Sequence, residues 1–232
     1  MTSWVMRMRW LDLLFAHWPV APDALLPLLP AGLELDVHDG RAWLGIVPFT
    51  MADVAPRGLP AVPHLSRFPE INVRTYVRHR GSPGVYFLSL DCASSLTVWG
   101  SRRFFHLPYF RAEMSSRWNG DEVDYRSNRA DRRGRPVAIE TRYRPTGPVE
   151  VAAPGSFEAW STDRMCLFAT DRRGRIWRTR IEHGPWPLQP ARADFATNTM
   201  ALAAGIPLPD GAPHLRFASR LDVHGFPPER VG

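Results

Sequence analysis

The chain has 232 residues, of which 44% are hydrophobic, so it is long enough to bury a substantial core. Its net charge is +6, and all 29 basic residues are arginine because the sequence contains no lysine. This composition excludes catalysis through an imine on a lysine side chain and leaves only the terminal amine for such chemistry. The arginines are scattered, without a helix-turn-helix or zinc-finger pattern, so we expect no nucleic-acid partner.

Other functional classes are disfavoured by the same survey. No stretch approaches the roughly 18 apolar residues of a membrane span, and the start lacks a charged region followed by an apolar run. We therefore expect a cytoplasmic protein with no membrane partner. The eight histidines have no paired spacing, so no metal or other cofactor is expected. Cys92 and Cys166 lie in apolar surroundings, which is typical of buried thiols.

The first part of the chain alternates extended runs with turn residues. Residues 7–20 mix aromatic and isolated polar side chains and indicate a strand, whereas residues 22–29, with an early proline, predict a short helix. Residues 33–37 and 42–49 flank Asp39-Gly40, which predicts a hairpin.

The rest of the chain is again mainly extended. The strands expected are residues 70–77 and 85–92 as one hairpin, 109–118 and 122–129 as another around Asn119-Gly120, 137–143, 176–181 and 214–223. The helices expected are residues 94–105, 156–163, and 194–204 closed by Gly205. Many short strands and few short helices favour one mainly β domain over residues 1–232, built as a closed or nearly closed antiparallel β-barrel.

The strand at residues 70–77 carries the strongest candidate for function. Its side chains alternate, so that Glu70, Asn72, Arg74 and Tyr76 share one face and the β-favouring residues share the other. At a rise of about 3.3 Å per residue, Glu70 and Arg74 are roughly 13 Å apart, and a small polar ligand could lie along them. The alternative is that these four side chains form the solvated face of a half-buried strand.

Several motifs resemble the YqjF-like family of uncharacterised bacterial proteins, DUF2071, over nearly the whole chain. The motifs that carry this resemblance are Phe15-Ala16-His17-Trp18-Pro19-Val20, Trp43-Leu44-Gly45-Ile46-Val47-Pro48-Phe49, residues 67–77, residues 84–91, Leu107-Pro108-Tyr109 and His183-Gly184-Pro185-Trp186-Pro187-Leu188. The family is grouped with the acetoacetate decarboxylase-like superfamily, which implies a cone-shaped β-barrel, with a few short peripheral helices, whose interior holds the site.

The decarboxylase mechanism does not carry over with this resemblance. Acetoacetate decarboxylase works through a lysine imine assisted by arginine and glutamate, and this chain has the last two residue types but no lysine. The chain also has Met165 after Thr162-Asp163-Arg164, where the family usually has an aromatic residue.

Two classes of function follow from the candidate residues. If the polar strand face points inward, Glu70 is the candidate acid or base and Arg74 the group that holds a carboxylate or enolate oxygen. The candidate substrate-binding residues are Asn72, Tyr76, Arg103, Tyr109, Arg164 and His183. One hypothesis is lysine-independent lyase or isomerase chemistry on a small carbonyl or carboxylate compound. The other is a non-catalytic protein that binds the same small anionic or carbonyl-containing ligand, and a homo-oligomer stays open in both.

Overall fold

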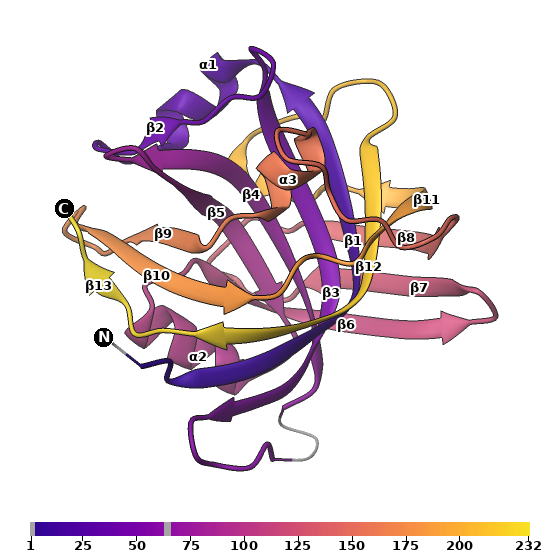
Figure 1. Ribbon diagram of the computed structural model, residues 1–232, viewed down its shortest axis with the longest axis horizontal. Coiled ribbons are helices and arrows are strands. Elements are labelled where there is room, and N and C mark those ends of the chain that lie inside the picture. Colours follow the sequence, from indigo (N-terminus) through magenta and orange to yellow (C-terminus); the bar gives the residue numbers. More distant parts are fainter. Residues whose placement is uncertain (1–2, 63–65) are drawn as a thin grey trace.

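The computed structural model describes residues 3–62 and 66–232 and is mainly β with a few short helices (Figure 1). The strands are β1 (Met6–Val20), β2 (Glu34–Leu35), β3 (Ala42–Pro56), β4 (Phe68–His79), β5 (Ser82–Cys92), β6 (Tyr109–Asn119), β7 (Glu122–Arg129), β8 (Ala138–Pro145), β9 (Cys166–Thr170), β10 (Ile176–His183), β11 (Leu188–Asn198), β12 (His214–Gly225) and β13 (Glu229–Arg230). The helices are α1 (Pro22–Leu25), α2 (Ser95–Phe104) and α3 (Phe157–Thr162), with 3₁₀ helices η1 (Leu26–Leu28) and η2 (Met200–Ala204). Within the described ranges, none of these helices combines the length and hydropathy that a membrane crossing requires.

The strands in the described part of the chain join into one sheet that closes on itself in two rings. A wall of five strands, in the order β5, β4, β3, β1 and β12, belongs to both rings. The first ring is completed by β10 and β9, and the second by β6, β7, β8 and β11. This arrangement encloses two separate interiors, one on each side of the shared wall.

The two rings separate where the outer edges of β5 and β12 are each divided between two partners. The early part of β5 pairs with β9 and its last residues pair with β6, in both cases in parallel. Similarly, β12 pairs with β11 near Phe217 and with β10 near Val223. The prediction of an antiparallel sheet is therefore correct for the other strand pairs and wrong for these two pairings of β5.

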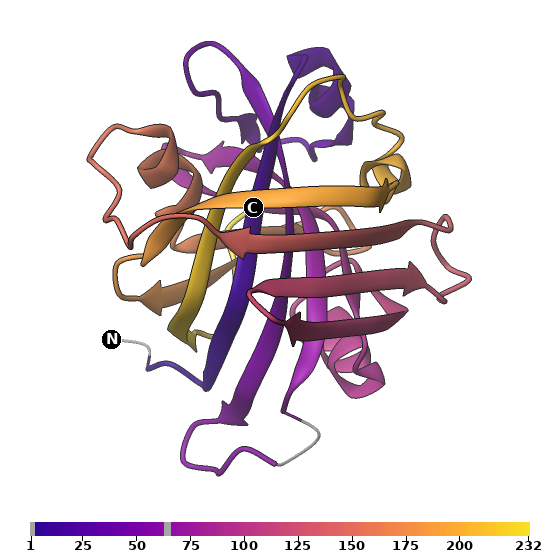
Figure 2. The same ribbon diagram turned by 90° about the vertical axis from the view of Figure 1, so that its right-hand side faces the viewer.

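The second ring is filled by a hydrophobic core. Strands β6, β7, β8 and β11 run across the long strands of the shared wall (Figure 2). Tyr125, Tyr143 and Phe217 are among the largest fully buried side chains and pack here with Ile71 and Val73 of β4. Apolar side chains thus occupy this interior, as is usual for a small closed sheet.

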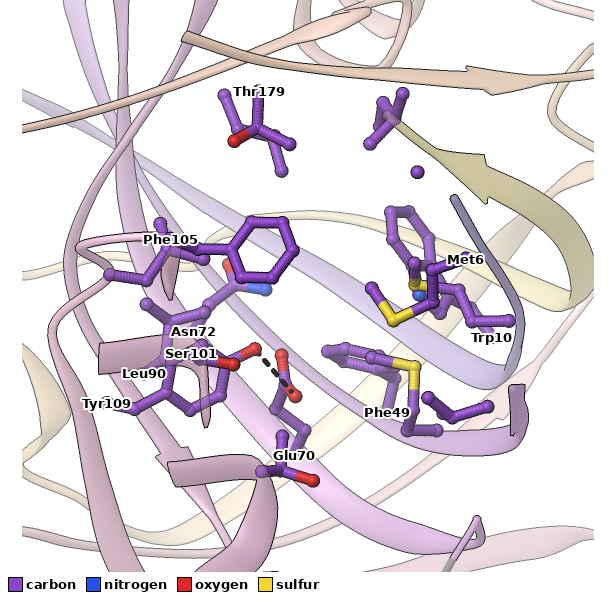
Figure 3. A pocket seen from close by; sticks show the side chains of 18 of the residues that line it. Met6, Trp10, Phe49, Glu70, Asn72, Leu90, Ser101, Phe105, Tyr109 and Thr179 are labelled. Atoms are coloured by element: carbon purple, nitrogen blue, oxygen red, sulfur yellow. Dashed lines mark hydrogen bonds between the residues drawn. The ribbon is translucent and has the colours of Figure 1, made fainter. Parts of the chain in front are cut away.

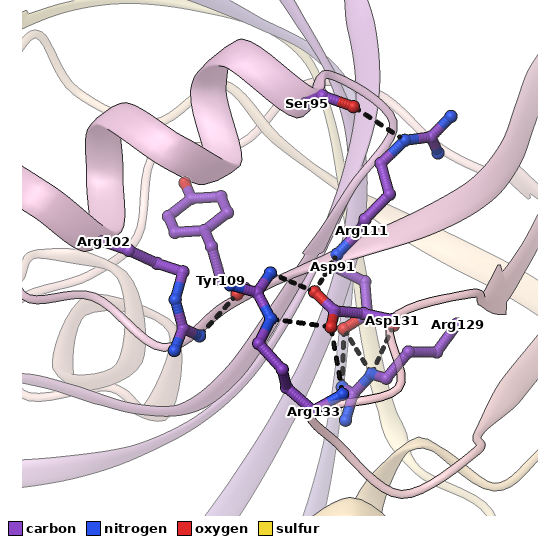
Figure 4. Close-up of polar contacts among 8 residues, drawn as sticks. All are labelled: Asp91, Ser95, Arg102, Tyr109, Arg111, Arg129, Asp131 and Arg133. Atoms are coloured by element: carbon purple, nitrogen blue, oxygen red, sulfur yellow. Dashed lines mark hydrogen bonds and ion pairs between the residues drawn. The ribbon is translucent and has the colours of Figure 1, made fainter.

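A buried ion pair links β5 to β7 in the second ring. Asp91 and Arg129 are 2.5 Å apart with side chains that are at most 1% exposed (Figure 4). The guanidinium also lies 4.1 Å from the Phe110 ring centroid. Their contact places one charge of each sign in a region of low dielectric, where each compensates the other.

Hydrogen bonds also fix α2 against β6, at the edge of the first ring. Arg102 of α2 donates to the backbone carbonyl of Tyr109 over 2.9 Å, and Arg111 of β6 donates to the Ser95 hydroxyl over 3.2 Å (Figure 4). Ser94 caps the start of the helix, and its hydroxyl accepts a hydrogen bond from the Thr97 amide as the sequence predicts. These contacts hold α2 beside Tyr109.

The predicted mainly β fold is confirmed, and so are the hairpins β4–β5 and β6–β7. The hairpin predicted for residues 33–49 is wrong, since β2 pairs with β4 and only a bridge joins His38 to Arg41. Asp36 explains this pairing, because its amide donates to the Tyr76 carbonyl and its carboxylate accepts from Arg78 and Arg164.

The helix predicted for residues 194–204 is also wrong in its first half. Strand β11 continues to Asn198, with Ala193 and Phe195 packed inward while Arg192 and Asp194 are exposed. This period of two, rather than a helical period, decides the structure. Only η2 is helical, and it ends as predicted at Gly205 in the left-handed conformation.

Two smaller expectations also needed correction. Cys92 is buried as predicted, but Cys166 is only half-buried. Strand β9, which begins at Cys166, was missed because its short run of mixed residues has no clear alternation.

Candidate functional site

The first ring encloses a cavity of about 530 Å³. Its walls come from β1, β3, β4, β5, β9 and β10, with α2 and α3 contributing side chains as well. Most of the lining is apolar, and the polar side chains are few. Such a cavity has the size and character of a small-molecule site.

Strand β4 supplies polar side chains to the cavity. Both faces of this strand are buried, one against the cavity and the other against the core of the second ring. Glu70, Asn72 and Arg74 line the cavity, whereas Ile71 and Val73 are fully buried in the core of the second ring. The alternation read from the sequence therefore separates a cavity from a core. The alternative of a solvated face is excluded, because the polar side chains are at most 9% exposed.

The two ends of the cavity differ in exposure. At the end near Arg74, the cavity is lined by Ser161, Thr162 and Arg164, which are all buried. At the other end it is lined by the exposed side chains of Trp99 and Phe104 and by other residues of α2. Helices α2 and α3 lie at opposite ends of the shared wall in Figure 1. The cavity therefore has a mouth at α2 and a closed end at α3.

Arg74 is a buried cation held by neutral groups. Its Nη2 donates to the Ser161 carbonyl over 3.4 Å, and its guanidinium lies 5.4 Å from the Phe15 ring and 5.6 Å from the Tyr76 ring. Its Nε is buried without a hydrogen-bond partner. Within residues 3–62 and 66–232, no carboxylate lies within ion-pair distance of this guanidinium. The closed end of the cavity therefore carries an uncompensated positive charge.

Arg164, at the same end, is compensated by a carboxylate. Its Nη1 lies 2.6 Å from Asp36, which also accepts from Arg78 over 2.9 Å, and its guanidinium is 4.6 Å from the Trp160 ring. Its Nη2 is buried without a partner and can still donate. Arg164 can thus add a hydrogen bond to an anion, although its charge is already paired.

Glu70 is a buried carboxyl that is protonated at neutral pH. Tyr109 donates a hydrogen bond to its Oε2 over 3.0 Å (Figure 3). Burial raises the pKa of Glu70 to about 8, and the Tyr109 hydrogen bond offsets this only in part. Around pH 7 the side chain is therefore an acid that can donate a proton inside the cavity.

His183 presents a free ring nitrogen to the cavity. Its Nδ1 lies 2.7 Å from the Gly184 carbonyl, which can only accept, so Nδ1 carries the proton in the neutral ring. Its Nε2 is buried without a partner, as is the Oδ1 of Asn72. These two atoms are hydrogen-bond acceptors that line the same cavity as the Glu70 acid and the Arg74 cation.

Two of the residues expected in the site lie outside it. Tyr76 is fully buried, but its ring is covered by Trp160 at 4.5 Å and its hydroxyl lies 2.5 Å from His17 Nε2, so it supports the site from behind. Arg103 is exposed on α2 over the Phe104 ring and is removed from the candidate site. Met165, which departs from the family pattern, is also exposed.

The structure adds residues that sequence reasoning missed. Ser161 and Thr162 reach the closed end from α3, and Trp10 lines the cavity with a buried indole nitrogen that has no partner. Of these three, only Thr162 had a local signal, since it begins the Thr162-Asp163-Arg164 segment that was compared with the family pattern. The others come from elements whose position depends on contacts far apart in the sequence.

Comparison with known protein families identifies the relatives of this chain. The family of uncharacterised conserved proteins DUF2071 matches residues 7–222. The chain belongs to this family. It is 44% identical over 224 residues to the uncharacterised protein YqjF of Bacillus subtilis, and the match covers 97% of this chain and 91% of that protein. The resemblance read from the sequence motifs is thereby confirmed.

Several solved structures have a fold similar to that of this DUF2071 protein. Acetoacetate decarboxylase from Legionella pneumophila superposes with a TM-score of 0.72 at 13% identity, over 98% of this chain and 87% of that one. The enduracididine biosynthesis enzyme MppR complexed with pyruvate superposes with a TM-score of 0.67 at 12% identity, over 100% and 92%. These similarities confirm the acetoacetate decarboxylase-like fold.

Proposed function

We propose that the cavity binds a small anionic carbonyl compound and acts on it by acid–base chemistry that needs no lysine. In this proposal Arg74 holds the carboxylate and Glu70 exchanges a proton with the carbonyl or enolate oxygen. The observation that carries the proposal is the buried Arg74 guanidinium, which lines the cavity and has no carboxylate partner in the described part of the chain.

A ligand carboxylate would supply the counter-charge that Arg74 lacks in the described part of the chain. A buried charge without a counter-ion is costly, and the aromatic rings of Phe15 and Tyr76 offset only part of that cost. A carboxylate can accept two parallel hydrogen bonds from the planar guanidinium, which fixes its orientation as well as its charge. The free Nη2 of Arg164 lies at the same end of the cavity and could add a third.

The other polar groups suit proton transfer next to a carbonyl. Glu70, protonated near neutral pH, can donate to an oxygen on which negative charge develops, and His183 Nε2 can accept a proton. A lyase or isomerase reaction through an enolate uses these two roles. The pyruvate named in the MppR structure supports 2-oxo acids as the first compounds to examine.

The second candidate is a binding protein that uses the same cavity without turnover. It is favoured by the separation of Arg74 from Glu70, whose Cα atoms lie roughly 13 Å apart along β4. The two side chains have different hydrogen-bond partners in the described part of the chain, so a ligand can be held by one of them without proton exchange with the other.

The test is a panel of 2-oxo and 3-oxo acids, followed by NMR for both binding and product. Turnover that is lost in Glu70→Gln and retained in Arg103→Gln supports the enzyme, and binding without turnover supports the binding protein. Borohydride added with substrate should leave no adduct, since the chain has no lysine. A panel in which no acid binds would overturn both functions, and a borohydride adduct on the terminal amine would overturn the imine-free mechanism.

A further inference from the structure

The cavity is larger than a short oxo acid requires. Volumes of 300–1,000 Å³ are typical of sites for ligands of drug size, and about 530 Å³ falls well within that range. A ligand of three or four carbons would leave most of the apolar lining without contacts. The volume therefore indicates that a larger part of the ligand is apolar.

Polarity within the cavity is graded from one end to the other. The uncompensated cation Arg74 lies at the closed end, and Glu70 and Asn72 follow along β4. The wall around and beyond Glu70 is mainly apolar, although Tyr109 and Ser101 also line it, and Met6, Trp10 and Phe49 are among its apolar side chains (Figure 3). Between the Cα atoms of Arg74 and Phe68, the cavity-lining part of β4 extends roughly 20 Å.

The mouth of the cavity is itself apolar. Leu96, Trp99 and Phe104 of α2 line it and are 63%, 60% and 52% exposed, and Val62 lies in the same lining with an exposure of 54%. Large apolar side chains gathered in the open are unusual unless they meet a ligand or a partner. Here they continue the apolar wall of the cavity outward, so they extend the surface available to a ligand.

We propose that the natural ligand is an amphipathic carboxylate, with its anionic head on Arg74 and an acyl or aryl body that extends along β4 to the rim formed by Leu96 and Trp99. This inference rests on the proposed function, because it uses the same anion site. It narrows the ligand class from any small anionic carbonyl compound to 2-oxo or related acids with an apolar body of roughly twelve carbons or more, the length needed to run along β4 toward the rim.

The test is a chain-length series of straight-chain 2-oxo acids from four to about sixteen carbons, a range whose longest members match the roughly 20 Å along β4, measured by isothermal titration below their micelle concentrations. We expect each added methylene to tighten binding by about twofold to fourfold until the chain passes the rim, since each buries apolar surface. A decanol titration serves as a probe of the same shape without the carboxylate.

A double substitution at the rim, Leu96→Ser with Trp99→Ser, is expected to reduce the gain for the longest chains and to leave the four-carbon acid unaffected. Both residues are exposed, so the substitution should not disturb the core. The matched control is Val149→Ser with Val151→Ser, since these side chains are 56% and 74% exposed and lie away from the cavity.

The outcomes separate the two proposals. If short acids bind and affinity does not rise with chain length, the amphipathic ligand is wrong and the anion site stands. If decanol binds as tightly as the ten-carbon acid, the apolar body is supported and the role of Arg74 is wrong. If affinity rises with chain length equally in the rim variant and the wild type, the assignment of the rim is overturned.

Discussion

Arg74 has the geometry of an anion-binding residue, because its guanidinium lies near the Phe15 and Tyr76 rings and donates to a backbone carbonyl of α3, with no carboxylate at ion-pair distance in the described part of the chain. Arg74→Lys keeps the charge but loses the planar pair of donors. We expect the affinity for a 2-oxo acid to fall by about 1–3 kcal/mol, as for the loss of a buried charged hydrogen bond. Titration calorimetry measures this, with the exposed Arg103→Lys as the control. Equal affinity in wild type and Arg74→Lys would remove Arg74 from the site.

Glu70 makes the stability of the protein depend on pH. Its pKa is about 8 in the folded protein and near the ordinary value of 4.5 in the unfolded chain, so the folded state binds the proton more tightly. The resulting stability is fully present below about pH 4.5 and is lost as pH rises through 8. We expect the wild type to lose on the order of a few kcal/mol relative to Glu70→Gln between pH 5 and 9. Denaturant titrations of both proteins measure this, and parallel pH profiles would contradict the raised pKa.

The polar face of residues 70–76 shows how far sequence reasoning reaches at this scale. The alternation correctly put Glu70, Asn72 and Arg74 on one side, because strand geometry is local. Tyr76 has the same parity and packs on the same side of β4, but it does not line the cavity because the Trp160 ring covers it. That contact joins segments far apart in the chain, and no local pattern reports it.

At the scale of elements, β3 packs closely against Arg74 and His17 at Gly45. A Cβ built at this position would lie 3.1 Å from the His17 ring and 3.2 Å from Arg74 Cγ, which is tighter than ordinary packing. We therefore expect Gly45→Ala to displace Arg74, to weaken anion binding severalfold, and to lower the unfolding free energy by about 1–3 kcal/mol. Gly100→Ala on α2 is the stability control.

Gly100 is a fair comparison because a Cβ there meets nothing within 4 Å. That change should raise helix stability by up to about 1 kcal/mol. Anion affinity and stability that are unaffected by Gly45→Ala would show that β3 does not set the position of Arg74.

Helices and strand pairings differ in how well the sequence predicted them. The caps of α2 and α3 are Ser94 and Ser156, each of which accepts a hydrogen bond from an amide three residues later, and such contacts are local. The pairing of β2 with β4 depends instead on Asp36 meeting Arg78 and Arg164. An Asp-Gly turn signal cannot show that a distant arginine competes for the preceding segment.

For the whole molecule, Asp91 and Arg129 form the most deeply buried ion pair in the described part of the chain, and they join the shared wall to the second ring. Asp91→Asn leaves the guanidinium buried without its counter-charge, so we expect a loss of about 3–5 kcal/mol in the unfolding free energy. Asp222→Asn is the control, because its pairs with Arg9 and Arg220 are exposed and should contribute no more than about 1 kcal/mol. Similar losses in both variants, measured by denaturant unfolding, would contradict the structural role of the buried pair.

The closed, mainly β architecture could be predicted from turn signals and family resemblance, but the two rings could not. Their separation depends on which part of β5 pairs with β9 or β6 and which part of β12 pairs with β10 or β11. Each choice joins strands distant in sequence. The cavity lies in the first ring, so its shape could not be predicted either, even though six of the polar residues that line it were identified: Glu70, Asn72, Arg74, Tyr109, Arg164 and His183.

The central claim is that the closed end of the cavity binds a carboxylate through Arg74, and a crystal structure with a bound ten-carbon 2-oxo acid tests it most directly. We predict that both carboxylate oxygens lie within hydrogen-bond distance of the Arg74 guanidinium and that the chain follows β4 past Glu70 toward α2. A carboxylate located at the α2 rim, or a ligand bound outside the first ring, would contradict the claim.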